Sequence, residues 1–170
     1  VLSVNTEDER FIFELLKTYN IDKKDFLVGL NPGANWSPKC WTVSGIAELA
    51  DKLINKYNAK IVITGNKKDR ILAKEIANKM QNEPLIMAGK TTLCQLAALI
   101  KRCNLFISAD SGPMHMAAAI RTPLIALFGP TSSQETGPIG SGRYKIIQKK
   151  VDCQPCKVIK CKNNLCMKSI

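Results

Sequence analysis

The residues best suited to chemistry are an acidic turn and the single histidine of the chain, which stand close together in one short stretch. Asp110, Ser111 and Gly112 follow an apolar run, and Pro113 opens a segment of small apolar residues that carries His115. Proline at the start of a helix sacrifices no hydrogen bond, and we expect Ser111 or Asp110 to cap the free amides. The stretch therefore predicts a strand, a turn and a helix whose N-terminus carries about half a positive charge and holds an anion.

The elements around this turn are predicted by alternating apolar patterns. Short apolar runs predict strands at residues 26–30, 60–64, 84–87, 105–108, 124–128 and 143–148. Apolar residues at helical spacing predict helices at residues 43–57, 68–80 and 92–102 and in the segment that begins at Pro113. This alternation predicts an α/β fold with a Rossmann-like parallel sheet and helices on both faces. In such a sheet, nucleotides and their diphosphates bind beyond the carboxyl ends of the strands.

Two other loops carry residues that could contact a phosphate. In the loop at 31–42, Gly33 lets the backbone approach a ligand, and Lys39 is a flexible cation suited to a diphosphate. The run Gly89-Lys90-Thr91-Thr92 resembles the end of a P-loop. Pro84, however, stands where that motif needs glycine, which excludes a P-loop nucleotide triphosphatase.

Composition narrows the class of protein. The 170 residues are sufficient for one domain with a real core, and no apolar run approaches the roughly 20 residues that span a bilayer. The net charge of +11 favours anionic partners: nucleic acid, a phosphate-bearing ligand or an acidic membrane surface. The lysines are dispersed and few aromatic residues lie among them, which disfavours nucleic acid. Two interpretations of the positive charge remain: a solvated lysine-rich surface, or a peripheral contact with a membrane.

The chain divides into three expected parts. It does not begin with methionine, and its first strand comes only after about 25 residues, which leads us to expect a fragment. Phe11, Ile12, Leu15 and Leu16 lie at helical spacing. We therefore expect residues 1–25 to be a linker helix from a missing N-terminal domain. Residues 26–150 form the predicted nucleotide-binding domain, and residues 151–170 a cysteine-rich C-terminal segment.

The last 18 residues contain four cysteines with the spacing C-x2-C-x4-C-x4-C: Cys153, Cys156, Cys161 and Cys166. Four thiolates among lysines could hold a structural zinc ion, although the spacing is not that of a standard zinc ribbon. Disulfides in a purified sample and reduced thiols are the two other interpretations. Cys40, Cys94 and Cys103 are scattered, and we expect them to be unreactive core thiols.

Five blocks of sequence together resemble the nucleotide-binding half of glycosyltransferase family 9, the ADP-heptose:lipopolysaccharide heptosyltransferases. The blocks are residues 31–41, 64–65, 88–93, 110–115 and 127–131, in the order and spacing of the family. The resemblance implies the GT-B architecture, in which two Rossmann-like domains face each other across the active-site cleft. This chain would be the C-terminal domain, which binds the ADP-sugar, while the N-terminal domain receives the acceptor.

The resemblance also implies roles for residues around the diphosphate. Lys39 should neutralise the diphosphate, and Ser111, Gly112 and His115 should surround it at the helix N-terminus. Asp110 should lie close to the sugar or orient neighbouring donors. Lys39 and His115 would thereby stabilise the negative charge that develops on the phosphate in the transition state.

The resemblance implies contacts with the nucleotide for three further residues. Thr91 should lie near the adenosine, and Thr131 should help to close the phosphate pocket. Asp69 stands where the family often has glutamate, and it should accept hydrogen bonds from the ribose hydroxyls.

The implied chemistry is inverting transfer of a heptose from ADP to the inner core of lipopolysaccharide, with no obligatory metal. The catalytic base belongs to the N-terminal domain, so we expect this chain to bind the donor and to be inactive alone. The implied location is the cytoplasm, with peripheral contact at the inner membrane. The alternatives are a transferase for another ADP- or UDP-sugar, a non-catalytic nucleotide-sugar-binding module and, least favoured, a nucleic-acid binder.

Overall fold

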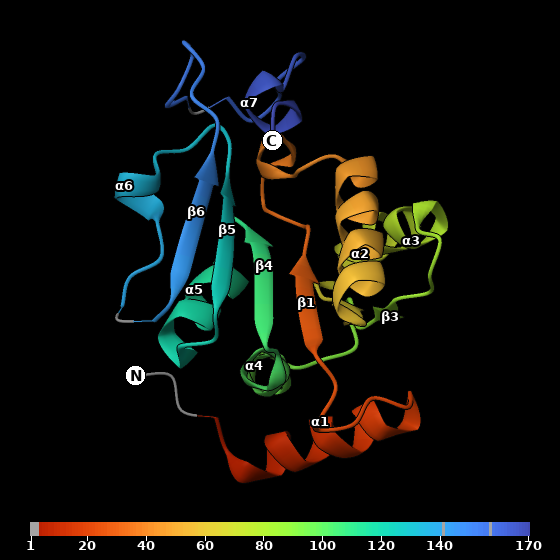
Figure 1. Ribbon diagram of the computed structural model, residues 1–170. Helices are drawn as coiled ribbons and strands as arrows, with labels where there is room; N and C mark the ends of the chain where they lie inside the picture. Colours follow the sequence, from red (N-terminus) through yellow and green to blue (C-terminus); the bar gives the residue numbers. More distant parts are fainter. Residues whose placement is uncertain (1–3, 141, 157) are drawn as a thin grey trace.

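The fold is built on a six-stranded sheet, seen in the computed structural model, which describes residues 4–140, 142–156 and 158–170 (Figure 1). The strands are β1 (Leu27–Asn31), β2 (Lys60–Ile63), β3 (Leu85–Ile86), β4 (Leu105–Ala109), β5 (Leu124–Phe128) and β6 (Tyr144–Gln148). Their order is β3-β2-β1-β4-β5-β6, and every neighbouring pair is parallel. The predicted Rossmann-like parallel sheet is therefore confirmed. The chain reverses its direction of travel across the sheet between β1 and β4, which creates a crevice at their carboxyl ends.

Helices cover both faces of the sheet, as predicted. The helices are α1 (Thr6–Thr18), α2 (Val43–Tyr57), α3 (Arg70–Lys79), α4 (Leu93–Arg102), α5 (Gly112–Ile120) and the short α6 (Ser133–Thr136) and α7 (Leu165–Lys168). Leu99 of α4 and Met114 of α5 pack against Phe106 on one face. Ile76 of α3 packs against Ile63 on the other face. Successive strand residues point to opposite faces, so each buried strand supplies both cores.

The helix ends follow local chemistry. Thr42 caps α2 by accepting a hydrogen bond from the Gly45 amide at 3.1 Å. Thr92 and Gln95 form a reciprocal capping box at the start of α4. Such caps satisfy the free amides of a first turn and fix where the helix begins.

Both ends of the described chain pack onto this sheet. Ile12 and Leu16 of α1 are each 1% exposed and belong to the core that α4 and α5 cover. Met167 of α7 is fully buried in the opposite core, and a side chain added at Gly129 would collide with it. Among the described residues no helix is long and apolar enough to cross a membrane.

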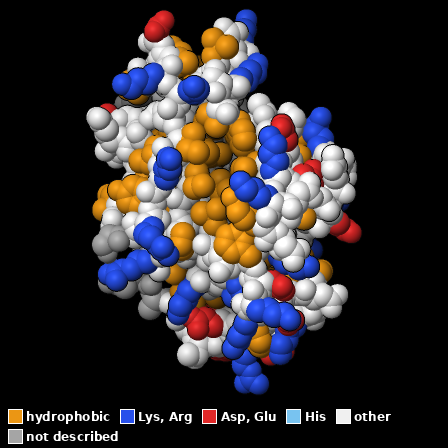
Figure 2. All heavy atoms as spheres, in the orientation of Figure 1, with side chains coloured by type: hydrophobic (Ala, Val, Ile, Leu, Met, Phe, Trp, Pro, Cys, Tyr) orange, Lys and Arg blue, Asp and Glu red, His pale blue; other side chains and the backbone are white. Residues whose placement is uncertain are grey.

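The two faces of the sheet are not covered equally. Figure 2 shows a stripe of hydrophobic side chains on the face where α2 lies, running between α2 and β6. Leu105, Ile125 and Ile147 are strand residues of the core on this face that stay partly exposed. Helices α2 and α3 therefore cover only part of this face.

Candidate functional site

The predicted site residues meet in one cavity at the carboxyl ends of β1, β2 and β4. The cavity has a volume of about 440 Å³, which is large enough for a nucleotide. Seven of the eight predicted site residues line it: Lys39, Asp69, Thr91, Asp110, Ser111, Gly112 and His115. Thr131 is not among the lining residues. The cavity therefore lies at the crevice where the strand order predicts a ligand.

Asp110 is the centre of the polar network at the base of the cavity. Its side chain is 5% exposed, and the Lys39 ammonium donates to its Oδ2 at 2.7 Å. The hydroxyls of Thr131 and Thr136 donate to the same oxygen at 2.7 and 3.3 Å. Asp110 thus orients neighbouring donors, and Thr131 reaches the site through it.

Lys39 is held at the edge of the cavity by two contacts. Besides its pairing with Asp110, its ammonium lies 5.0 Å from the centre of the Trp36 ring. An ammonium group has three donor hydrogens, so one ion pair leaves hydrogens for a ligand. The side chain is therefore positioned in advance at the cavity wall.

Asn31 connects the loops of the site, a role that the sequence pattern did not indicate. The side chain is 3% exposed, and its amide donates to the Gly33 carbonyl and to the Ser111 hydroxyl, each at 3.1 Å. Its carbonyl oxygen accepts from the Thr64 hydroxyl at 3.2 Å. One side chain therefore ties the loop after β1 to the residue after β2 and to the turn before α5. A polar residue at the end of an otherwise apolar strand was the only available signal.

The expected side-chain cap of α5 is absent, so that prediction was wrong. Ser111 occupies the N-cap position, but its hydroxyl donates to the Ala109 carbonyl at 3.1 Å and accepts from Asn31. Asp110 is occupied by Lys39 and the two threonines. Within the described part of the chain no side chain therefore caps the first turn of α5, which leaves the positive end of the helix facing the cavity.

The space over the start of α5 is open. A Cβ atom added at Gly112 would meet no atom within 4 Å. His115, one turn further along α5, is exposed and lines the same cavity. The helix N-terminus, His115 and Lys39 thus offer donors to one anion-sized space.

Asp69 lies where two glycines make room for it. A Cβ atom on Gly33 would be 2.5 Å from the Asp69 carboxylate, and one on Gly65 would be 2.7 Å from Asp69 Cβ. Asp69 Oδ2 accepts a hydrogen bond from the Asn66 amide at 2.8 Å. The glycines on the first two loops therefore set the position of this carboxylate in the cavity wall.

Two threonines, Thr91 and Thr136, line the cavity from different elements. Thr91 lines the cavity just before α4. Thr136 in α6 also lines it and contacts Asp110, although the sequence pattern gave Thr136 no role. A threonine in a four-residue helix gives no periodic signal, because such a helix is too short to show one.

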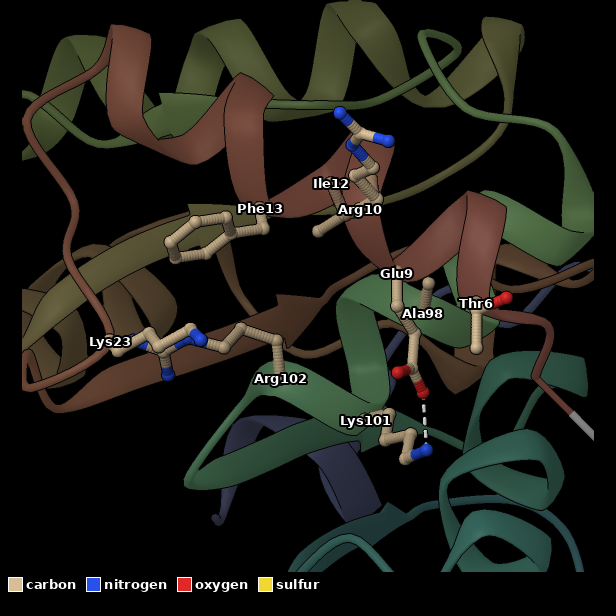
Figure 3. Close-up of a pocket in the computed structure, with 9 residues that line it drawn as sticks. All are labelled: Thr6, Glu9, Arg10, Ile12, Phe13, Lys23, Ala98, Lys101 and Arg102. Atoms are coloured by element: carbon tan, nitrogen blue, oxygen red, sulfur yellow. Dashed lines mark hydrogen bonds and ion pairs between the residues drawn. The ribbon is translucent and has the colours of Figure 1, made fainter.

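A second cavity, of about 400 Å³, lies between α1 and α4 (Figure 3). Ile12, Phe13 and Ala98 contribute its apolar wall, and Glu9 pairs with Lys101 across it. Arg102 donates to backbone carbonyls of the loop that precedes β1. None of the predicted site residues lies there, and α1 lies at the opposite end of the strands from the crevice (Figure 1). We therefore assign the candidate site to the first cavity.

Comparison with known proteins settles the family. Residues 3–167 match the family model described as glycosyltransferase family 9 (heptosyltransferase). The chain belongs to this family. The resemblance expected from the five sequence blocks is thereby confirmed.

Individual relatives within family 9 agree with this assignment. The chain is 33% identical to lipooligosaccharide heptosyltransferase 2 of Campylobacter jejuni over 150 residues, which is 85% of this chain and 47% of the relative. It is 37% identical to lipopolysaccharide heptosyltransferase 2 of Salmonella typhimurium over 76% of this chain and 38% of the relative. The structure of E. coli ADP-heptose lps heptosyltransferase II superposes with a TM-score of 0.78 and 29% identity over 89% of this chain and 46% of that one. The chain thus spans about half or less of the length of these relatives.

The cysteines of this family 9 chain are all free thiols, and each lies in the described part of the chain. Within the described residues no three His, Cys, Asp or Glu side chains are grouped so that they could hold a metal ion, so the zinc site stays a prediction. Burial raises the pKa of the Cys166 thiol, and the neighbouring thiols of Cys153, Cys156 and Cys161 raise it further.

The three scattered cysteines lie in different environments. Cys103 is buried, and burial raises its pKa to about 12, as expected for an unreactive core thiol. Cys40 is partly buried, which also raises its pKa. Cys94 is exposed in the first turn of α4, so its predicted core position was wrong.

Proposed function

We propose that this chain is the donor-binding part of a lipopolysaccharide heptosyltransferase and that it holds ADP-activated heptose at the start of α5. The observation that carries the proposal is the uncapped N-terminus of α5, which opens beside Lys39 and His115 at the crevice between β1 and β4. The name of the E. coli relative, an ADP-heptose heptosyltransferase, supports this choice of sugar nucleotide.

In this proposal the diphosphate lies over Gly112. The free amides of the first turn, the Lys39 ammonium and the His115 ring donate to its oxygens. As the sugar leaves, negative charge grows on the β-phosphate, and these fixed donors stabilise it where it develops. Asp110 keeps Lys39 in place, since both are largely buried and 2.7 Å apart. Lys39 and the helix thereby take the role that a metal ion has in other transferases.

The remainder of the nucleotide would follow the cavity toward β2 and β3. Asp69 has one oxygen bound to the Asn66 amide, and its carboxylate can accept from ribose hydroxyls. Thr91 would lie beside the adenosine at the start of α4. The cavity volume of about 440 Å³ agrees with a nucleotide of this size.

We infer that the base for the acceptor hydroxyl is not supplied by the residues that the structure describes. The two carboxylates that line the cavity, Asp69 and Asp110, are engaged by the Asn66 amide and by Lys39 with two threonines. In a GT-B enzyme this chain would be the C-terminal domain, and an N-terminal domain would bring the base and the lipopolysaccharide acceptor. Inverting transfer would then take place in the cytoplasm, at the surface of the inner membrane.

The experiment is calorimetric titration of the chain with ADP and, in parallel, with UDP. We expect ADP to bind more tightly than UDP. His115→Ala should weaken ADP binding by about 1–3 kcal/mol, the range for a lost charge-assisted hydrogen bond. Lys39→Ala should weaken it by at least as much. Lys74→Ala, at an exposed lysine of α3, is the matched control and should change nothing.

The possible outcomes distinguish an ADP site from a site for another nucleotide. Thermal unfolding of each variant distinguishes a binding loss from a folding loss, since Lys39→Ala also leaves buried Asp110 without its cation. Tighter binding of UDP would assign the site to another nucleotide sugar. Equal affinity of the His115→Ala variant and the unaltered chain for ADP would contradict the placement of the diphosphate.

A further inference from the structure

The end of the chain is strongly basic. Residues 149–168 contain six lysines and one acidic residue, Asp152. The five lysines of this segment that the structure describes are all exposed: Lys149, Lys150, Lys160, Lys162 and Lys168. Figure 1 places the segment beyond the carboxyl ends of β5 and β6, and Figure 2 shows Lys and Arg side chains at this end of the molecule. The positive charge therefore lies at the same end of the sheet as the candidate site.

Aliphatic side chains are exposed among these lysines. Val158 is 48% exposed, Ile159 is 59% exposed and Leu165 is 56% exposed. The segment contains no aromatic residue, so it offers no platform on which a nucleic-acid base could stack. Exposed aliphatic residues flanked by lysines instead match a membrane interface, where the aliphatic groups enter the headgroup region and the lysines meet anionic lipid.

The segment is fixed to the turn beside the candidate site. The Cys156 amide donates to the Pro130 carbonyl at 2.7 Å, and the Gln154 side chain donates to the Gly129 carbonyl. Buried Met167 packs against the same turn at Gly129. Thr131, which follows Pro130 in this turn, donates a hydrogen bond to Asp110. A surface bound by this segment would thus lie close to the cavity.

We propose that residues 149–168 dock the protein on an anionic phospholipid bilayer. The lysines contact the lipid phosphates, and Val158, Ile159 and Leu165 enter the interface. The inference rests on the proposed function, in which a membrane carries the acceptor. It assigns the membrane contact to the surface formed by residues 149–168. Docking there holds the carboxyl edge of the sheet near that membrane.

The test is co-sedimentation of the reduced 170-residue chain with vesicles of phosphatidylcholine, with and without phosphatidylglycerol. We expect binding only when phosphatidylglycerol is present. The double variant Lys160→Glu/Lys162→Glu should lower the partition coefficient at least about tenfold. Val158→Ser/Ile159→Ser should lower it about tenfold in high salt, where electrostatic attraction is screened.

The matched control is Lys74→Glu/Lys79→Glu, which makes the same charge change at two exposed positions of α3. It should lower the partition coefficient no more than about twofold, since screening limits the reach of distant charges. An equal loss in both charge variants would overturn the assignment to this segment. Tight binding of transfer RNA with no preference for phosphatidylglycerol would overturn the membrane as the partner.

The same preparations are titrated with ADP to separate this inference from the proposed function. Chain that binds ADP but not anionic vesicles would refute the docking surface alone. Chain that binds vesicles but not ADP would refute the donor site alone. Retained ADP affinity in the variants shows that they are folded.

Discussion

At the scale of single residues, the site depends on which side chains are already engaged and which groups stay free. Asp110 Oδ2 accepts from Lys39 and from two threonine hydroxyls, and the Ser111 hydroxyl accepts from Asn31 and donates to the Ala109 carbonyl. The amides at the start of α5 therefore have no side-chain partner among the residues that the structure describes. The chain places its strongest unsatisfied donors where an anion is expected to bind.

Gly112→Ala tests this arrangement with the smallest change. No atom lies within 4 Å of the added methyl group, so the free energy of unfolding should stay within about 0.5 kcal/mol of the unaltered chain. The methyl group would project into the space assigned to the diphosphate, and we expect ADP affinity to fall at least about tenfold, or 1.4 kcal/mol. Calorimetry and urea unfolding on the same sample measure both quantities. Unchanged ADP affinity would show that the diphosphate does not lie over Gly112.

The sequence predicted the turn and helix start that these residues form, but it did not predict which hydrogen-bond partners their side chains have. The order Asp110-Ser111-Gly112 before a proline indicated a turn and a helix start, because those preferences are local. The hydroxyl of Ser111 has several partners within reach, and only the tertiary structure decides among them. For the same reason the sequence did not predict the contacts of Asn31 and Thr136, since their partners lie on distant parts of the chain.

At the scale of elements, apolar periodicity predicted the strands and long helices, whereas it did not predict α6 and α7. These helices have four residues each, fewer than the repeats a period needs. The spacing of Ile12 and Leu16 predicted the helix α1, and packing against α4 explains their burial. Periodicity cannot give the order of strands in a sheet, which depends on how crossover helices pack.

Leu16→Ala tests whether α1 is part of the core. Leu16 is 1% exposed, so removing its side chain should lower the free energy of unfolding by about 2–5 kcal/mol. Phe11→Ala, at a residue of α1 that is 46% exposed, is the control and should cost less than about 1 kcal/mol. Urea unfolding gives both values. Equal effects of the two substitutions would show that α1 does not stabilise this fold.

At the scale of the whole molecule, the two ends of the sheet have different roles. The carboxyl end carries the cavity, the uncapped helix and the basic C-terminal segment, while α1 packs at the other end (Figure 1). The net charge of +11 indicated an anionic partner, but composition cannot say where the charge lies. The structure concentrates a large part of it beside the carboxyl edge of β5 and β6.

The position of the nucleotide decides whether the start of α5 is the donor site, and a crystal structure of the chain with ADP measures that position directly. We predict the β-phosphate within hydrogen-bonding distance of the first-turn amides of α5 and of Lys39, with the ribose at Asp69. The Lys39–Asp110 ion pair, whose charged atoms lie 2.7 Å apart, should persist. ADP bound in the cavity between α1 and α4, or with its phosphates away from α5, would contradict the account.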